Sequence, residues 1–465
     1  MSEYTEQLER EYQNEVVKLF VEQLEYDYLG NLQYARGANT NSSGLKNGPI
    51  IDSELRSNLN SAGYTPMQVE EAVRQLKSKA RLTDKRFVCL CDTNNSIYEM
   101  LVQGISAKPT PERNEEDVMF FDFKHPYRNR FAIAEEVSYI DPLTTSHCRP
   151  DIVVYVNGIA LCIIELKRAF VSIDEAIRQN LSNERDLIPS FFTTTQFTVA
   201  AHRAEHKEGL DKVKDEHYGF KYATVGTPLE FWCPWKKDTN QTGIVLSDTE
   251  SYLDFFNKET FMFLVRYGVL SDGGIKKVMW PHQYHALRAA EPRLYDQASG
   301  VIWHSQGSGK SLTMVWIASF IRDNFKDPRV IVITDRTELD VQLSSDFSDA
   351  GNNLHRATSQ EDLLKTLQSG KEWLIMTLIH KFGNRRSGGE TTDKRSTKIP
   401  LDSYLRELKA TIARQFPEGF KAKGKNIFIF IDECHRTQGG RLHDAMRVIM
   451  GQNVMHIGFT GTPLL

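Results

Sequence analysis

The spacing of hydrophobic positions changes along the chain and separates two regions. From about residue 275 onward, short strand-like runs, several of them apolar throughout, alternate with helix-like segments. Strands covered by helices on both faces show this pattern, so the region predicts an α/β domain with a parallel sheet. The predicted strands are residues 301–303, 330–334, 373–377, 427–431 and 454–460.

The first 235 residues mix helical and strand patterns without that regular alternation. Apolar residues at three- and four-residue spacing predict a helix within residues 3–29. Thr65, Pro66 and Gln68 form a capping-box start for a second helix. Short strands are predicted at residues 87–91, 119–123, 137–140, 196–200 and 221–224.

Polar segments indicate where the regions divide. Residues 236–243 predict a linker, and the Phe- and Leu-rich residues 251–267 predict one or two helices at the junction. We therefore expect one domain at residues 1–235, a linker with junction helices at 236–275, and a second domain at 276–465. Residues 36–48 are expected to form a loop and residues 385–398 an exposed insertion.

Composition and charge narrow the class of protein. Apolar residues make up 40% of the 465 positions, which is enough for packed cores. The net charge of 57 − 61 = −4 excludes a surface that is basic all over, but it does not exclude a local basic groove that binds nucleic acid. No apolar run approaches the roughly 18 residues that span a bilayer, and the polar N-terminus has no signal-peptide pattern. The six cysteines form no CxxC pair, so we expect reduced thiols, a cytoplasmic location and no membrane partner.

A Gly- and Ser-rich segment follows the first strand of the α/β region and precedes an apolar helix. Its glycines allow a tight turn whose N–H groups point at phosphate oxygens, and the helix N-terminus adds partial positive charge. Lys310 is placed to reach the outer phosphates and Ser311 to hold Mg2+. This order predicts an ATP site, with an ordinary glycine-rich turn as the alternative. The candidate residues are Gly307, Ser308, Gly309, Lys310 and Ser311.

Two acidic residues end the fourth predicted strand, at the edge where open α/β sheets place ligands. Asp432 is expected to hold Mg2+ through water and Glu433 to align the attacking water, unless both merely form a solvated strand end. Gln283 is a candidate adenine reader, because an amide both donates to and accepts from a base edge. Thr460 and Thr462 are candidates for sensing the phosphate state.

Three basic residues near strand ends are candidates for DNA contact or coupling: Arg336, Lys381 and His435. For Arg336, a salt bridge to a neighbouring carboxylate is an equally good interpretation.

Two strongly β-forming runs flank Asn157 and Gly158, a strong hairpin signal. Asp151 opens the first run, and Glu165 and Lys167 close the second, two positions apart and therefore on one face. Two carboxylates brought together bind a divalent cation, and a lysine beside them orients an attacking water or stabilises phosphate charge. The alternative is a solvated hairpin end that carries a surface ion pair.

The turn geometry decides whether these three polar side chains meet. A plain two-residue turn pairs position 151 with 164 and puts Glu165 on the face opposite Asp151. A three-residue loop with a left-handed Gly158 and a bulge pairs 151 with 163, so that the three side chains share a face. The metal-site hypothesis therefore predicts a glycine bulge at Gly158.

This hairpin resembles the PD-(D/E)xK nuclease motif, with Pro150-Asp151 and Glu165-Leu166-Lys167. The resemblance implies a Mg2+-dependent nuclease of mixed α/β fold.

A helix is predicted after the hairpin, with a capping box formed by Ser172 and Glu175. Nucleases of this kind often carry Gln-x-x-x-Tyr on that helix. Here Gln179 is present, whereas Asn183 stands at the position of the tyrosine. Gln179 therefore remains open between a site residue and a polar surface residue.

The second region resembles superfamily 2 helicase-like motors, which close ATP between two RecA-like domains. The resemblance rests on Gln283, the loop at 304–311, Asp335-Arg336, Asp432-Glu433-Cys434-His435 and Thr460-Gly461-Thr462-Pro463. The loop has His304 where its first glycine usually stands. Trp-His-x-Gln-Gly-Ser-Gly-Lys is the usual form in the motor subunits of type I restriction enzymes.

The whole set resembles the restriction (motor) subunit of type I restriction–modification enzymes. This implies an N-terminal PD-(D/E)xK nuclease-like α/β domain plus one RecA-like parallel-sheet domain, with Mg2+ and ATP as cofactors. It also implies duplex DNA, a methylase and a DNA-specificity subunit as partners, and ATP-driven translocation followed by remote cleavage. Because the sequence ends at Leu465, we expect an N-terminal fragment that lacks the second RecA-like domain and does not translocate alone.

Two other classes fit the same residues. A repair-type ATP-driven nuclease–helicase would work without a methylase, so copurification with methylase and specificity subunits separates the two. A non-cleaving, nucleotide-switched DNA-binding module would carry a decayed hairpin. Mg2+-dependent nicking that is lost in Asp151→Ala would exclude it.

Overall fold

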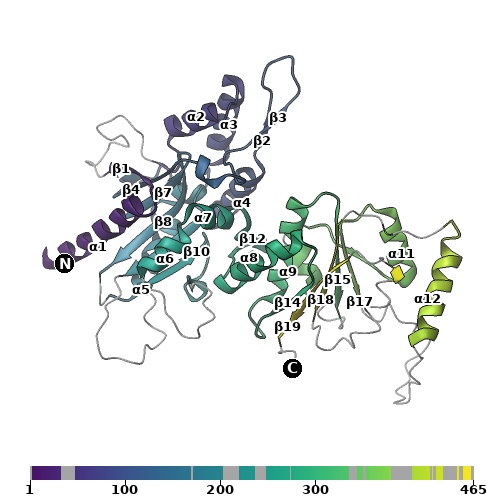
Figure 1. Cartoon of the computed structure of the whole chain (residues 1–465). Coiled ribbons are helices and arrows are strands. Elements are labelled where there is room, and N and C mark those ends of the chain that lie inside the picture. The colour runs from purple at the N-terminus through teal and green to yellow at the C-terminus, as the bar shows by residue number, and fades with distance from the viewer. Residues whose placement is uncertain are drawn as a thin grey trace, which may run out of the picture. The chain divides into compact units, whose positions relative to one another are not determined.

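The computed structural model describes most of the chain, and the described ranges are 3–32, 48–168, 171–202, 219–235, 248–272, 274–334, 343–348, 352–378, 401–418, 422, 426–432, 448–449 and 454–461. The chain divides into two compact units, Met1–His282 and Gln283–Leu465 (Figure 1). The predicted linker at 236–243, most of the predicted loop at 36–48 and the predicted insertion at 385–398 lie outside the described residues. The division expected at residues 235 and 275 stays a prediction.

A seven-stranded mixed sheet forms the centre of the first unit, in the order β1-β4-β7-β8-β9-β10-β11. The β1–β4 and β8–β9 pairs are parallel, and the other neighbours are antiparallel. Every residue of β7 and nearly every residue of β8 is buried, as expected for strands covered on both faces. The strands are β1 Asp27–Asn31, β4 Phe131–Glu135, β7 Ile152–Val156, β8 Ile159–Lys167, β9 Phe197–His202, β10 Phe220–Ala223 and β11 Cys233–Pro234.

Helices and three small hairpins complete the first unit. The helices are α1 Glu3–Glu22, α2 Asp52–Ser61, α3 Pro66–Lys79, α4 Phe87–Gln103, α5 Ile173–Ser182, α6 Asp248–Phe255 and α7 Lys258–Tyr267, with short turns η1 Pro126–Arg128, η2 Asn183–Leu187, η3 Pro189–Thr193 and η4 Leu229–Phe231. The hairpins pair β2 Ile105–Ala107 with β3 Glu116–Val118, β5 Tyr139–Ile140 with β6 His147–Cys148, and β12 Val269–Asp272 with β13 Ile275–Val278. Nowhere in the described ranges is a helix long and apolar enough to cross a membrane.

The helix starts test the capping predictions. At α3 the Thr65 side chain accepts from the Gln68 backbone, and the Gln68 side chain accepts from the Thr65 N–H at 3.0 Å, so the predicted capping box is confirmed. At α5 the Ser172 side chain instead accepts from the N–H of Asp174 at 3.3 Å. The capping box predicted with Glu175 is therefore wrong, although the helix begins where it was expected.

Several predicted elements of the first unit are also wrong. Residues 87–91 are the first turns of α4, not a strand, because Leu90, Asn94, Ile97 and Leu101 are buried at helical spacing. The predicted strand at 119–123 is absent from this described stretch, where β3 already ends at Val118. Of the strand predicted at 137–140, only the last two residues form a strand, β5. The helix predicted within 3–29 is α1, which ends at Glu22, and β1 begins at Asp27.

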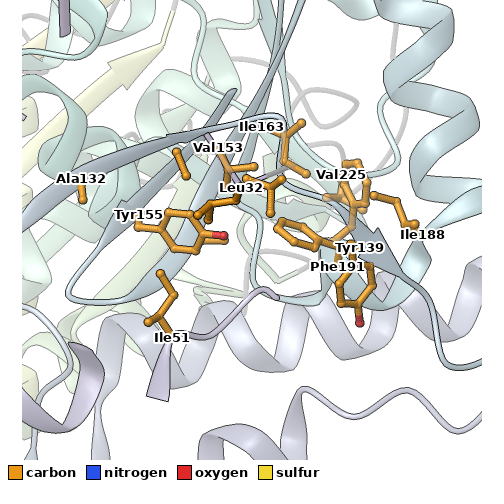
Figure 2. Packing of buried hydrophobic residues seen from close by; sticks show 14 of the residues in the cluster. Leu32, Ile51, Ala132, Tyr139, Val153, Tyr155, Ile163, Ile188, Phe191 and Val225 are labelled. Carbon is orange, nitrogen blue, oxygen red and sulfur yellow. The ribbon is translucent and has the colours of Figure 1, made fainter. Parts of the chain in front are cut away.

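Figure 2 shows the core on one face of the β7–β8 pair. Val153 and Tyr155 of β7 and Ile163 of β8 are buried with Tyr139 and Phe191, whose rings meet edge to face at 5.1 Å between centroids. The Tyr155 hydroxyl reaches the carbonyl of Gly48 at 3.1 Å, so its polar atom is satisfied within the core. This packing fixes the two strands against their surroundings.

The register of the β7–β8 hairpin corrects the turn prediction. Val156 pairs with Ile159, so Asn157 and Gly158 form a two-residue turn, with φ of 51° and 80° as a type I′ turn requires. The glycine bulge predicted at Gly158 is therefore wrong. A bulge occurs further along: Tyr155 pairs with Ala160 but Val154 pairs with Cys162, which leaves one extra residue in β8.

Gly158→Ala should destabilise the first unit more than Gly63→Ala does. Both glycines have positive φ, 80° and 91°, so each alanine carries a backbone strain of about 1–3 kcal/mol. A Cβ at Gly158 would also lie 2.7 Å from Glu54 Cβ and 2.8 Å from the Ile51 carbonyl oxygen, whereas nothing lies within 4 Å at Gly63. Urea unfolding followed by circular dichroism measures both variants, and equal losses would contradict the close packing at the turn.

The second unit is built on a six-stranded parallel sheet, in the order β14-β19-β18-β15-β17-β16. All five strands predicted for this region are present, and the predicted α/β class is confirmed. The strands are β14 Gly300–Trp303, β15 Pro328–Thr334, β16 His355–Arg356, β17 Leu374–Leu378, β18 Asn426–Asp432 and β19 Met455–Thr460, and the helices are α8 Pro281–Tyr295, α9 Lys310–Asn324, α11 Gln360–Ser369 and α12 Leu401–Gln415.

Candidate functional sites

The open end of the β7–β8 hairpin brings the predicted carboxylates together. Ile152 pairs with Ile164, so Asp151 at the preceding position lies opposite Glu165, and their carboxyl groups interact. Asp151 Oδ2 also accepts from the Leu166 N–H at 2.7 Å. Asp151 is partly buried and Glu165 fully buried. The extra residue in β8 thus restores the shared face that the predicted glycine bulge was meant to supply.

Both carboxyl groups are poised for a cation. Burial raises the pKa of Asp151 to about 6, against the lowering effects of the Leu166 N–H and Lys167. Burial, and then the charge of Asp151, raises the pKa of Glu165 above its usual range. Since two adjacent carboxylates, one fully and one partly buried, repel each other, a hard divalent cation between them relieves the repulsion. The donor set therefore fits Mg2+. Within the described ranges, no three His, Cys, Asp or Glu side chains gather as a metal-binding group.

Helix α1 supplies residues to this site that the sequence analysis missed. Lys167 Nζ lies 3.1 Å from Glu9 Oε1 and donates to the Leu166 carbonyl at 2.9 Å. Burial lowers the pKa of Lys167, but Asp151, Glu165 and Glu9 outweigh it and raise the pKa, so the amine stays charged. Glu9 is 158 positions away from Lys167, and no local pattern links them.

Two amides hold the carboxylate of Glu165. Gln179 Nε2 donates to Glu165 Oε2 at 2.6 Å, and Asn183 Nδ2 donates to Glu165 Oε1 at 2.8 Å. The two residues are four positions apart, about one helical turn, so they project from neighbouring turns. Gln179 is therefore a direct contact of the carboxylate pair. Asn183, noted in the sequence only as a missing tyrosine, is the second contact.

The Gly-rich loop of the second unit has the conformation that its sequence predicts. Gly307 and Gly309 have φ of 79° and 76°, the left-handed region that glycine enters at little cost. Helix α9 starts at Lys310, and the Gly309 carbonyl accepts from the Thr313 N–H at 3.1 Å. The loop therefore leads directly into a helix N-terminus, where backbone N–H groups favour anions. Ser311 is in the first turn of that helix.

Gln283 packs against this loop. Its side chain is 3% exposed, and its Nε2 donates to the carbonyls of Gly309 and Ser308, at 3.2 and 3.4 Å. The amide therefore supports the loop backbone. Its suggested reading of adenine stays a prediction.

The remaining described candidates lie at one edge of the parallel sheet. Trp303 pairs with Thr460 and Asp432 with Phe459, so the carboxyl ends of β14, β19 and β18 are adjacent. Lys310 Nζ lies 3.2 Å from the position of a Cβ on Gly461, so the amine reaches the end of β19. Lys310, Thr460 and Asp432 therefore gather where a parallel α/β sheet binds ligands. The other candidates, Arg336, Lys381, Glu433, His435 and Thr462, lie outside the described residues.

The two units define a class: a nuclease-like domain with a buried carboxylate pair, on one chain with a helicase-like ATPase domain. Comparison with protein families matches residues 6–214 to "Type I restriction enzyme R protein N terminus" and residues 282–465 to "SWI2/SNF2 ATPase". Residues 6–214 are thus similar to the N-terminal part of type I restriction enzyme R proteins, and residues 282–465 are similar to SWI2/SNF2 ATPases. The resemblance seen in the sequence is confirmed.

Curated relatives carry matching descriptions. The endonuclease subunit of type I restriction enzyme SsaAORF53P from Staphylococcus saprophyticus is 26% identical over 436 residues, covering 89% of this chain and 42% of the relative. The HindI endonuclease subunit of Haemophilus influenzae is 27% identical over 441 residues, covering 86% of this chain and 37% of its own length. The chain thus spans about two fifths of these relatives. Among solved structures, a nuclease-deletion mutant of the type ISP restriction–modification enzyme LlaGI aligns over 41% of this chain and 18% of its own, with 15% identity and a TM-score of 0.29.

Proposed function

We propose that this chain carries the Mg2+-dependent DNA-cutting centre and an ATP-binding domain of a type I restriction subunit that translocates duplex DNA. The convergence of Asp151, Glu165 and Lys167 at one end of the β7–β8 hairpin carries the proposal. The hairpin lies within the segment that matches the R protein N terminus, which favours this function over a repair-type nuclease–helicase.

The chemistry of cutting follows from the donors around the carboxylate pair. Asp151 and Glu165 would hold Mg2+, which supplies Lewis-acid stabilisation of charge on the scissile phosphate. Glu165 is kept in place by its two amide donors. Lys167 stays charged, so it orients the attacking water and donates to a phosphate oxygen as negative charge develops there.

The nucleotide site divides its tasks in the same way. The N–H groups after Gly307 bind the phosphates, and Lys310 contacts the outer ones. Ser311 and Asp432 would hold Mg2+, and Glu433 aligns the attacking water. Methylase and specificity subunits would select the DNA, while the subunit that contains this chain moves and cuts it.

A cleavage assay tests the proposal with the full-length restriction subunit, the methylase and specificity subunits and supercoiled plasmid. We expect cleavage that requires both ATP and Mg2+ and that falls at least about 10³-fold in Asp151→Ala. Cleavage that persists in Asp151→Ala would remove this hairpin from the reaction.

Gln283→Ala is expected to weaken binding of ATP and GTP alike, by up to roughly 5–160-fold. The substitution removes hydrogen bonds to the loop carbonyls, each worth about 0.5–1.5 kcal/mol, and these do not depend on the base. Fluorescent-nucleotide titration of the full chain measures both affinities. A loss confined to ATP would instead assign Gln283 to the adenine.

A further inference from the structure

Asn183 lies between Glu165 and a thiol that the proposed reaction does not use. Its Nδ2 donates to Glu165 Oε1 at 2.8 Å, and its Oδ1 accepts from Cys148 Sγ at 3.1 Å. Asn183 is 1% exposed, and Cys148, on the short strand β6, is partly buried. A thiol, an amide and a carboxylate therefore form a continuous chain of hydrogen bonds.

The two neighbours of Asn183 select the same orientation of its amide. Rotation of the amide by 180° would exchange its oxygen and its NH2 group. The rotated amide would place its oxygen against the Glu165 carboxylate, so two acceptors would face each other. It would place its NH2 group against the Cys148 S–H, so two donors would face each other. Burial, and then the charge of Glu165, raises the pKa of Cys148 to about 12, which keeps the thiol protonated as a donor.

The position of Glu165 depends on this orientation because both of its oxygens are held. Gln179 holds Oε2 at 2.6 Å while Asn183 holds Oε1, and the carboxylate faces Asp151 across the strand pair. Asn183 also opens the π-helical turn Asn183–Leu187, a local irregularity often found at functional sites. A change at Asn183 therefore acts on the carboxylate without touching Asp151.

We propose that Cys148 and Asn183 are positioning residues that orient Glu165 for divalent-cation binding. The inference rests on the proposed function, because the Asp151–Glu165 pair must bind the cation for its orientation to matter.

Calorimetric titration of the full chain with Mn2+ tests the pair. Removing an outer contact of a metal ligand typically costs 10–100-fold in affinity, so we expect a loss of roughly that size in Asn183→Ala. Cys148→Ala loses one weak donor and should bind roughly 2–12-fold more weakly, while Cys148→Ser keeps a donor and retains the wild-type affinity. The double variant C148A/N183A should bind no more weakly than N183A, because the thiol acts through the amide.

Cys162→Ala is the matched control. Cys162 is a fully buried thiol of β8 whose Sγ contacts the Ile163 carbonyl at 3.7 Å, so its loss tests for general damage to the core. It should lower the unfolding midpoint and leave Mn2+ affinity unchanged. If the wild type binds Mn2+ and both N183A and C148A bind it equally well, the inference is wrong and the proposed function stands. If the wild type binds no Mn2+, both are wrong. Should N183A not fold, the difference between C148A and C148S decides.

Discussion

Asp151→Asn is expected to abolish divalent-cation binding and DNA cleavage while making the cation-free protein more stable at pH 7.5. The asparagine oxygen retains the bond from the Leu166 N–H, and its NH2 group donates to Glu165 in place of a repelling charge. Against an unfolded pKa near 3.9, a folded pKa of about 6 corresponds to a gain of up to about 3 kcal/mol at neutral pH. Activity and stability therefore change in opposite directions.

The pH dependence of the wild type follows from the same raised pKa. Between about pH 4 and pH 6 the folded state binds more protons than the unfolded state, so the stability of the cation-free protein falls as pH rises through this interval. The cation needs a deprotonated Asp151, so its affinity is low below about pH 6 and increases toward neutral pH. Asp151→Asn should remove this contribution to the pH dependence and the stabilisation by Mn2+.

Thermal unfolding at pH 5 and pH 7.5, with and without Mn2+, measures these effects. Asp122→Asn is the control, because Asp122 Oδ1 accepts from the backbone N–H groups of Lys124 and His125. Although burial opposes it, these bonds and His125 lower the pKa of Asp122, so its substitution should reduce stability at pH 7.5. A lower stability in Asp151→Asn at pH 7.5, or cleavage that survives, would contradict the arrangement of the carboxylate pair.

Lys310→Ala, made in the full-length subunit, is expected to reduce ATP turnover at least about 100-fold in the complex with DNA and partner subunits. The amine begins α9, reaches the end of β19, and lies at the sheet edge where Asp432 also stands. No other lysine or arginine stands in residues 304–311 to replace it. Mn2+ binding by the Asp151–Glu165 pair should be unchanged, because that pair belongs to the other unit.

A second variant tests the same contact without removing the amine. In Gly461→Ala, the new Cβ would lie 3.2 Å from Lys310 Nζ and 3.0 Å from Gln306 Cγ, so the lysine must shift. We expect a smaller loss of turnover than in Lys310→Ala. Lys365→Ala is the control, since Lys365 is an exposed lysine of α11 paired with Glu361. Full turnover in Lys310→Ala would exclude this loop as the nucleotide site.

Most of the parallel sheet was predictable because several of its strands are short and apolar throughout, whereas the two-residue strand β16, His355–Arg356, was not predicted. Residues 427–431 are buried along nearly their full length, and a single sequence shows such a run directly. The capping box at Thr65 was equally predictable, since Thr65, Pro66 and Gln68 are close together in sequence. The helical spacing of α4 was visible too, but a short apolar stretch at its start favoured a strand.

The sequence predicted the residues of the carboxylate site better than it predicted their geometry. Asp151, Glu165 and Lys167 were predicted from spacing, but Glu9 lies on a distant helix, and only the folded chain brings its carboxylate to Lys167. Position 183 was marked by the Gln-x-x-x-Tyr pattern, but the residue there is asparagine and not the tyrosine that the pattern has. A hydrogen-bonding role can be kept by an amide where a hydroxyl was expected.

The bulge in β8 has a consequence for how this hairpin tolerates change in length. All residues of β7 and nearly all of β8 are apolar and buried on both faces. Sliding one strand by a residue would therefore replace apolar side chains on each face with other apolar side chains. Only the polar residues at the open end distinguish the two alignments. Deleting Leu161 would remove the extra residue while Val154 still pairs with Cys162 and Asp151 still lies opposite Glu165. A hairpin that kept Leu161 but lost the bulge would instead pair Asp151 with Ile164 and separate the two carboxylates.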